Sequence, residues 1–257
     1  MCLLVSEPYI SLRFRAQEEQ IRPGCVRMLR AGSAGGNTRE AFPDPVDAAA
    51  VCLSTGADYI VVHLRKDERH INKKDLAQLC KYFPGKIHLE CSVEPAMEKA
   101  ALTYKPHSVC IVPEHPGEVT TMGGLKFTPA VIKRLASMIE RLHKKGILVS
   151  LFVSPEPSDI RQAAKLGADI VELCTRDYSE ATSAAQARKR LQDLALSTLL
   201  AKELGLQVHA GHGLDYHNVL AVADLGGVTC MNIGFAIVTR ALFAGLPTAV
   251  NEMKGLL

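Results

Sequence analysis

Several patterns are missing from this sequence, and each absence argues against a class of protein. No uninterrupted apolar run reaches the roughly 18 residues of a transmembrane helix. The eight cysteines form no C-x-x-C pair, which argues against zinc ribbons and thioredoxin-like redox motifs. H-x-H and H-E-x-x-H are absent, and no strand-like run precedes G-x-G-x-x-G. We therefore expect no metal site, no nucleotide cofactor and no membrane partner.

The composition is that of a globular protein with a mild positive charge. Hydrophobic residues make up 47% of the chain, and the formal charge is 30 − 27 = +3. This charge suits small anionic ligands and argues against a nucleic-acid partner, which needs a clustered basic face. The sequence starts with MCLLVSEPYISLRFR, whose apolar stretch is too short for a signal peptide. Most cysteines lie in apolar runs, so we expect reduced, buried thiols and a cytoplasmic location.

From about residue 43 onward, short apolar runs alternate with longer amphipathic ones. Each short run is rich in β-branched residues and nearly continuous in hydrophobicity, as expected of parallel strands buried on both faces. These predicted strands are 59–63, 86–91, 108–112, 147–153, 169–174, 206–211 and 228–234. The stretches 129–145, 155–167 and 182–205 between them have helical character, and Gly167 and Gly205 stop two of them.

This alternation is a βα repeat, and seven units are visible. The length of 257 residues is close to the roughly 250 of an α/β barrel, and no linker divides the chain. We therefore predict a single (β/α)8 TIM barrel with additional short helices, whose missing strand lies within residues 1–42. An open doubly wound sheet is the competing fold.

Polar residues stand at the carboxyl ends of the predicted strands, where barrel enzymes carry their chemistry. They are His63 and Arg65, Glu90, Pro113 and Glu114, Glu172, His212 and Gly234. His63, His212, Glu90 and Glu172 therefore converge on one mouth of the predicted barrel.

The segment HLRKDERH begins with His63 at the end of an apolar strand. A lone histidine there is usually a satisfied core residue, but Arg65 and His70 follow it in the same loop. Such a loop is suited to gripping a phosphate or carboxylate, although a solvated charged loop is the plain alternative. Glu90 and Glu172 each sit near a buried strand end, where a carboxylate serves as a general acid or base or forms a structural ion pair.

The stretch AGHGLDYHNV places His212 between two glycines, which lets the backbone approach a ligand. We expect the helix that follows, with Asp215 near its start, and the helix after Gly234 to offer N–H groups to an anion. Loops after strands 7 and 8 are the usual phosphate site of this fold. Residues 113–125 form a long loop, either a lid with Thr120 or Thr121 as a ligand contact or a plain surface loop.

Taken together, these motifs resemble the pyridoxine 5'-phosphate synthase family. The resemblance covers about residues 42–254, and its motifs follow the family order. The stretches that carry it are FPDPVDAA (42–49), GADYIVVHLRKDERHI (56–71), IHLE (87–90), KPHSVCIVPE (105–114), EVTTMGGL (118–125), GILVSLFV (146–153), GADIVEL (167–173), AGHGLDYHNV (210–219) and NIGFAI (232–237).

The resemblance implies a barrel enzyme that assembles as a homo-oligomer, typically a homo-octamer, without a metal or organic cofactor. Its reaction is the condensation of 1-deoxy-D-xylulose 5-phosphate with 3-amino-2-oxopropyl phosphate, releasing inorganic phosphate and water. Motif by motif, the family roles fall on ten residues of this chain. His63 and Glu90 match the proton acceptors of the family, His212 matches its proton donor, and Glu172 matches a residue that stabilises the transition state. The family contacts to deoxyxylulose phosphate fall on Arg65, His70 and Thr120. The family contacts to the amino-ketone phosphate fall on Gly213, Gly234 and Phe235.

The chain departs from the family pattern near its start. The family's first strand ends in N-I-D-H, whereas the nearest segment here carries Ser6, Pro8 and Tyr9, and the loop with Arg30 and Arg39 is an alternative source of a phosphate ligand. We therefore predict one domain over 1–257, divergent over 1–42 and family-like over 43–254.

Two further departures lie near the expected site. Phe235 replaces a histidine, and CTR (174–176) replaces H-T-G. An active synthase is favoured because the three acid/base positions are present. A weakened or non-catalytic paralogue that binds a phosphorylated metabolite is the alternative.

Overall fold

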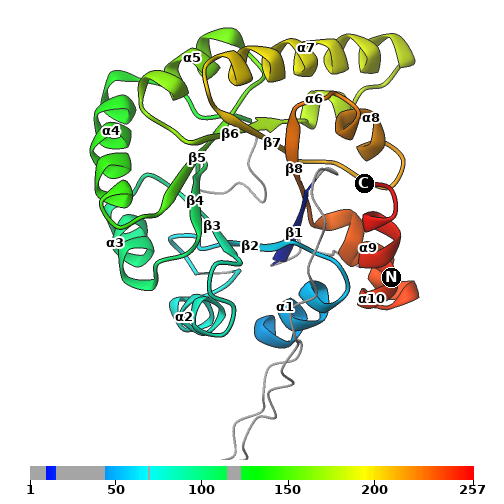
Figure 1. The fold of residues 1–257 in the computed structure, drawn as a ribbon, viewed down its shortest axis with the longest axis horizontal. Coiled ribbons are helices and arrows are strands. Elements are labelled where there is room, and N and C mark those ends of the chain that lie inside the picture. Colours follow the sequence, from blue (N-terminus) through cyan, green and yellow to red (C-terminus); the bar gives the residue numbers. More distant parts are fainter. Residues whose placement is uncertain (1–9, 16–43, 69, 115–122) are drawn as a thin grey trace, which may run out of the picture.

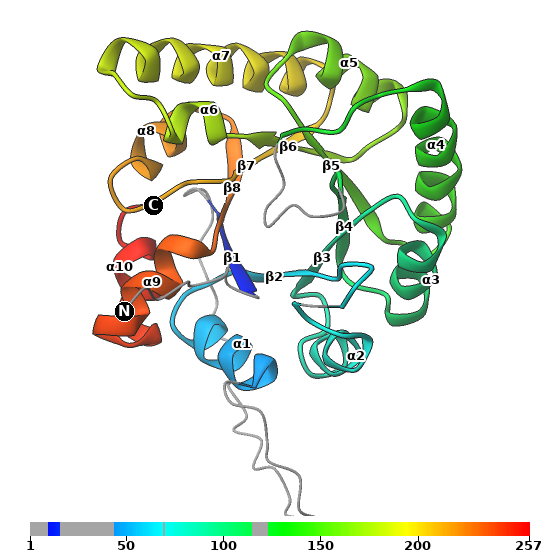
Figure 2. The same cartoon turned by 180° about the vertical axis from the view of Figure 1, so that it is seen from behind.

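The computed structural model describes residues 10–15, 44–68, 70–114 and 123–257, with the backbone alone for residues 10–15. Eight strands close into a barrel in sequence order, and the helices surround it (Figures 1 and 2). The strands are β1 (Ile10–Arg15), β2 (Tyr59–His63), β3 (Ile87–Cys91), β4 (Ser108–Ile111), β5 (Leu148–Val153), β6 (Ile170–Cys174), β7 (Gln207–Gly211) and β8 (Val228–Ile233).

The helices follow the strands as a βα repeat requires. They are α1 (Pro45–Ser54), α2 (Lys73–Tyr82), α3 (Pro95–Tyr104), α4 (Pro129–His143), α5 (Pro157–Lys165), α6 (Arg176–Ser179), α7 (Ala184–Glu203), α8 (Val219–Ala223), α9 (Phe235–Ala244) and α10 (Leu246–Lys254). The predicted barrel is confirmed, and α6 and α8 are short additional helices. The two predicted glycine stops are confirmed as well, because Gly167 and Gly205 adopt φ of +80° and +78°.

The first strand lies within the first 42 residues, as expected, but its direction differs from that in a regular barrel. Strands β2 to β8 are parallel, whereas β1 runs antiparallel to both neighbours. Ile10 pairs with Val62, and Arg15 pairs with Cys230. Because a free strand edge accepts a parallel or an antiparallel partner, β1 closes the gap between β8 and β2 in this direction.

Side-chain alternation along the strands divides the molecule into an outer core and a barrel interior. In β3, Ile87 and Leu89 belong to the apolar core beneath the helices, whereas His88 and Glu90 line cavities inside the barrel. The outer core joins every strand from β2 to β8 to the surrounding helices. The interior positions are therefore available for polar side chains.

The interior opens at both ends of the barrel. At the carboxyl ends of the strands it forms the pocket that is treated below. At the amino ends a second cavity of about 1090 Å³ is lined by residues that include Tyr59, His88 and His209.

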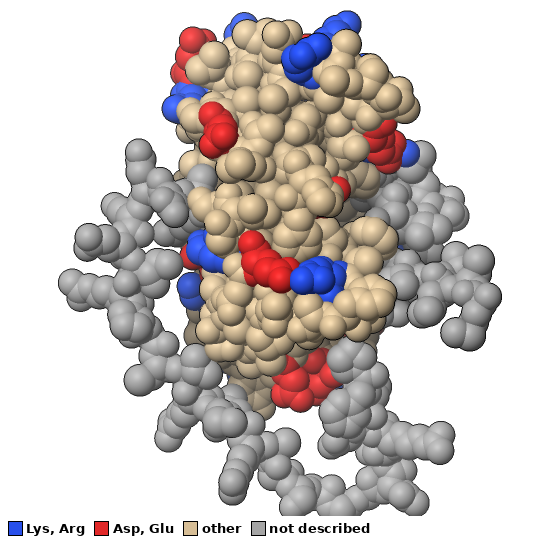
Figure 3. Space-filling view, turned by 90° about the vertical axis from the view of Figure 1, so that its right-hand side faces the viewer, with Lys and Arg blue, Asp and Glu red and all other residues tan. Residues whose placement is uncertain are grey.

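Charged side chains are interspersed on the outer surface. Figure 3 looks onto the side that carries α9 and α10 and shows Lys and Arg mixed with Asp and Glu among uncharged residues. Two ion pairs in this region are Arg240 with Glu252 at 2.7 Å and Lys254 with Asp58 at 3.1 Å. In the part of the chain that the structure describes, no helix has the length and apolar character needed to cross a membrane.

The six cysteines within the described ranges are free thiols, and five of them are buried. This matches the expected apolar role of these residues. Burial raises the pKa of the Cys174 thiol to about 11, so the protonated form prevails at neutral pH.

Gly124 holds the end of the loop after β4 against β5. A Cβ atom at this position would lie 2.1 Å from the Ser154 nitrogen and 2.8 Å from Val153 Cα, both backbone atoms. The next residue, Leu125, donates its N–H to the Phe152 carbonyl at 2.9 Å. Only a residue without a side chain allows this approach.

We predict that Gly124→Ala lowers the free energy of unfolding by about 3 kcal/mol, because the backbone of β5 must shift to admit the methyl group. Chemical denaturation monitored by circular dichroism measures this change. Gly255→Ala is the matched control, since its Cβ would meet nothing closer than 3.4 Å, and we expect a change within about 0.5 kcal/mol. Equal stability of the two variants would contradict the packing argument.

Candidate active site

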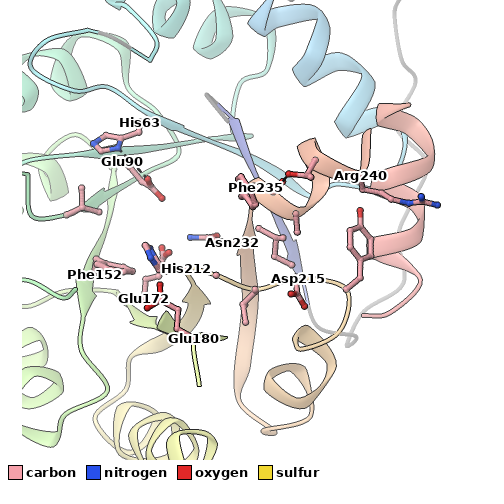
Figure 4. Close-up of a pocket in the computed structure, with 18 of the residues that line it drawn as sticks. His63, Glu90, Phe152, Glu172, Glu180, His212, Asp215, Asn232, Phe235 and Arg240 are labelled. Atoms are coloured by element: carbon pink, nitrogen blue, oxygen red, sulfur yellow. Dashed lines mark hydrogen bonds and ion pairs between the residues drawn. The ribbon is translucent and has the colours of Figure 1, made fainter. Parts of the chain in front are cut away.

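One pocket of about 800 Å³ lies at the carboxyl ends of the strands (Figure 4). Nine of the ten residues predicted from the sequence line it, and the tenth, Thr120, lies outside the described residues. The nine are His63, Arg65, His70, Glu90, Glu172, His212, Gly213, Gly234 and Phe235. Strand ends and loops far apart in the sequence therefore bring the predicted set to a single place.

His63 and Glu90 form one wall of the pocket. They are register partners on the adjacent parallel strands β2 and β3, so their side chains emerge on the same side. His63 Nδ1 lies 4.0 Å from Glu90 Oε2, and both side chains remain about one-fifth exposed, at 18% and 22%. The His70 ring lies 5.8 Å from the His63 ring, centre to centre. A histidine and a carboxylate at this spacing can exchange protons with a molecule in the pocket.

Arg65 is the buried cation of the site. Its guanidinium group donates to both carboxylate oxygens of Asp67, at 3.2 and 3.3 Å, and lies 3.7 Å from Glu114. Glu114 also accepts the Lys66 backbone N–H at 3.2 Å. These carboxylates fix the guanidinium in place, as a buried charge requires.

Glu172 stands opposite that wall, on β6, and is only 3% exposed. The Cys110 thiol donates to its Oε2 at 3.5 Å. On the other side the carboxylate lies against Gly211, where a Cβ would come within 2.6 Å of Oε1 and 2.9 Å of the Asn232 Cβ. Gly211 is therefore required so that the Glu172 carboxylate and Asn232 can occupy this space together.

His212 projects from the turn after β7 and faces the same space. Its φ of +87° is unusual for a residue with a side chain and costs about 1–3 kcal/mol. Burial, and then the positive charge of Arg176, lower the pKa of His212, while Glu180 opposes them. The Phe152 ring lies 6.5 Å away, centre to centre, and contributes to this partly desolvated setting.

Two helix starts were expected to offer N–H groups to an anion. After His212, the Asp215 carboxylate accepts the N–H groups of His217 and Asn218, at 2.8 and 2.9 Å. Asp215 therefore occupies two N–H groups of the turn, whereas no side chain caps the following helix α8, whose N-cap is Asn218. The expectation that this helix offers N–H groups to an anion stays a prediction. At the start of α9, Gly234 is the N-cap and again no side chain caps the helix. That helix terminus can receive an anion.

Sequence reasoning missed several residues that line the pocket. Asn232, at 6% exposure, extends between the His212 side and Phe235 (Figure 4). An amide side chain near the end of the largely apolar run VTCMNI was the available signal. Val112 and Phe152 carried no signal, since an apolar residue that faces inward looks the same in sequence as one that faces the helices.

No group of three or more His, Cys, Asp or Glu side chains in the described ranges has an arrangement that could hold a metal ion. The chemistry that this arrangement offers is that of paired acids and bases. Histidine and carboxylate side chains stand on both sides of the pocket, and the buried Arg65 and the uncapped terminus of α9 lie beside them. The fold and the site thus define an α/β-barrel protein with an acid/base pocket suited to an anionic ligand.

Comparison with known proteins identifies the family to which this barrel belongs. The model of the family "Pyridoxal phosphate biosynthesis protein PdxJ" matches residues 29–257, and this chain belongs to that family. The resemblance found in the sequence is therefore confirmed. The match begins before the region where the resemblance was seen, so it includes Arg30 and Arg39, which lie outside the described residues.

Curated relatives agree with this family. The pyridoxine 5'-phosphate synthase of Elusimicrobium minutum (strain Pei191) is 54% identical over 213 residues, 83% of this chain and 88% of that protein. The protein of the same name from Magnetococcus marinus is 44% identical over 218 residues, 85% of this chain and 89% of that protein.

Among solved structures, a 3-hexulose-6-phosphate synthase has a TM-score of 0.57 at 13% identity, covering 82% of this chain and 92% of that one. This likeness shows the barrel fold alone.

We predict that Arg176→Gln raises the pKa of His212. The substitution removes a positive charge that lowers this pKa, and it frees Glu180, which raises it, from its 3.0 Å ion pair with Arg176. Both changes favour the imidazolium form, so deprotonation moves to higher pH. The pH dependence of His212 modification by diethyl pyrocarbonate, which attacks neutral imidazole, measures the shift by peptide mass spectrometry.

Arg134→Gln is the control for this measurement, because Arg134 is an exposed residue of α4 paired with Glu94 at 3.8 Å on another side of the barrel. It should leave the His212 profile unchanged. A downward shift in Arg176→Gln, or equal shifts in both variants, would contradict the electrostatic account.

Proposed function

We propose that this chain is a pyridoxine 5'-phosphate synthase. It condenses 1-deoxy-D-xylulose 5-phosphate with 3-amino-2-oxopropyl phosphate to give pyridoxine 5'-phosphate, inorganic phosphate and water. The observation that carries the proposal is the pocket in which the His63 and Glu90 pair faces Glu172 and His212. Family membership and curated relatives of that name support it.

The reaction needs several proton transfers, since a carbon–nitrogen bond forms, water is lost and the ring closes. His63 and Glu90 accept protons from the bound substrates. His212, across the pocket, donates a proton to a leaving oxygen, and the buried Glu172 carboxylate stabilises positive charge that develops on the substrate nitrogen. Groups in separate environments can hold different protonation states at one pH, which such a sequence of steps requires.

Two phosphorylated substrates require two anion sites. The α9 terminus at Gly234, with the N–H groups of Phe235 and the residues after it, suits the phosphate of the amino ketone. We assign Arg65 and His70, which line the pocket, to deoxyxylulose phosphate, and the family resemblance adds Thr120, which lies outside the described residues. Gly213 lines the pocket, and its lack of a side chain allows the backbone to approach the phosphate of the amino ketone.

The proposal includes assembly as a homo-oligomer, with a homo-octamer as the expected state and the cytoplasm as the location. Leu242 and Phe243 on α9 are 61% and 87% exposed, and apolar side chains of this size are usually covered. Light scattering of the purified chain gives the number of subunits. A monomer at micromolar concentration would contradict the proposed homo-oligomer.

The alternative function is a paralogue that binds a phosphorylated metabolite without turnover. One observation favours it: the strand that closes the barrel, β1, precedes residue 29, where the family match begins. Substrate binding without product from the intact chain would support this alternative.

We predict that Glu90→Gln lowers kcat by about 10²- to 10⁴-fold, because an amide cannot accept the proton. Binding of deoxyxylulose phosphate should remain within about threefold, since the shape and polarity of the side chain are kept. Steady-state assays of pyridoxine phosphate formation and calorimetric titration measure the two quantities.

Glu203→Gln is the matched control, because Glu203 is exposed at the end of α7 and does not line the pocket. It should have the kcat of the unmodified chain. Normal turnover by Glu90→Gln would show that Glu90 is not the proton acceptor.

A further inference from the structure

The backbone conformation of His212 has to be held by its surroundings. A φ of +87° lies in the left-handed region, which residues with a side chain avoid. Neighbouring Gly213 has φ of +80°, so two successive residues of the turn adopt this conformation. A turn of this kind relaxes unless other groups fix its carbonyls, and such strain is retained mainly where a function depends on it.

Thr175 supplies this restraint from the end of the neighbouring strand β6. Its hydroxyl donates to the Gly211 carbonyl at 2.8 Å and to the His212 carbonyl at 2.6 Å. Its backbone N–H also donates to the Gly211 carbonyl, at 2.9 Å. One hydroxyl has one proton, so the two carbonyls share it and are drawn toward the same point.

The hydroxyl of Thr175 makes hydrogen bonds that differ from those of an ordinary helix N-cap. Thr175 is the N-cap of α6, where a threonine side chain ordinarily accepts an N–H of its own helix. Here the side chain makes no cap hydrogen bond and donates across to the β7 turn instead. Thr175 is also fully buried, so the bonds to the turn are shielded from water.

The packing of α6 beneath the turn provides a second, independent restraint. The Ser179 hydroxyl lies 3.5 Å from the His212 carbonyl, and a Cβ at Gly213 would come within 2.1 Å of that hydroxyl. The turn and α6 are therefore in direct contact around His212. Arg176 and Glu180, the charged residues beside the imidazole, belong to the same segment.

We propose that Thr175 is a positioning residue for the reaction, whose hydroxyl holds the backbone of His212 so that the imidazole faces the substrates. The inference rests on the proposed function, in which His212 is the proton donor. Thr175 itself touches neither substrate; it acts through the turn that it fixes.

The test compares three variants of the full chain. Thr175→Val keeps the shape of the side chain and removes the hydroxyl, whereas Thr175→Ser keeps the hydroxyl. Thr198→Val is the matched control, because Thr198 is equally buried, on α7, and its hydroxyl has no hydrogen-bond partner among the described residues. Thermal melts establish that each variant is folded.

We expect Thr175→Val to lower kcat by about 10- to 100-fold and to change KM for either substrate by less than about threefold, since a displaced acid affects the chemical step more than binding. Thr175→Ser should restore kcat to within about threefold of the unmodified chain, and Thr198→Val should match it. A kcat for Thr175→Val equal to that of Thr198→Val would overturn the proposal. If Thr175→Val does not fold, Thr175→Ala is judged by the same criteria against Thr175→Ser.

A second readout separates this inference from the proposed function. Diethyl pyrocarbonate modification of His212 needs no turnover, and Thr175→Val should make it faster and move its midpoint to higher pH as the imidazole leaves its buried place. If the unmodified chain makes no pyridoxine phosphate, the proposed function fails, but this readout still decides whether Thr175 positions His212. An unchanged modification profile in Thr175→Val would overturn the positioning role.

Discussion

The structure depends on the alternation of side chains along the parallel strands β2 to β8. One set of positions packs against the helices and contributes the apolar core, and the other set faces the barrel interior. Because the two sets are independent, the outer set stabilises the fold while the inner set holds polar groups. His88 and Glu90 face inward from the same strand whose Ile87 and Leu89 complete the core.

A polar side chain inside the barrel lowers the stability of the fold unless a hydrogen bond or an ion pair compensates for its loss of water. Arg65 is held by Asp67 and Glu114, and the Glu172 carboxylate is held by the Cys110 thiol in space left by Gly211. His212 differs from these residues, because what has to be held in place is its strained backbone and not its side chain. The β6–α6 junction that fixes this backbone is therefore as much part of the site as the side chains that line it.

The fold was largely predictable from the sequence, because periodicity reports burial directly. Seven strands and the glycine stops appear where the pattern placed them. The direction of β1 was not predictable, since an isolated strand carries no signal of whether it pairs parallel or antiparallel. The hydrogen bonds of Asp215 to the N–H groups of His217 and Asn218 were not predictable either, because the sequence does not show which nearby N–H groups an aspartate accepts.

The site was predictable in part. Polar residues at the ends of apolar strands stood out, and the structure brings nine of them to one pocket. Asn232 was a weak signal, Thr175 was noted only as part of the CTR stretch that departs from the family pattern, and Phe152 gave no signal. Their importance comes from contacts between segments that are distant in the sequence, such as the hydroxyl of Thr175 on the carbonyl of His212.

In the proposed reaction, this pocket closes the pyridine ring. An end-point assay of the purified chain with both phosphorylated substrates, quantifying pyridoxine 5'-phosphate and inorganic phosphate, tests it most directly. We expect the two products to appear in equal amounts. Phosphate release without pyridoxine phosphate, or no product from a folded chain that binds deoxyxylulose phosphate, would contradict it.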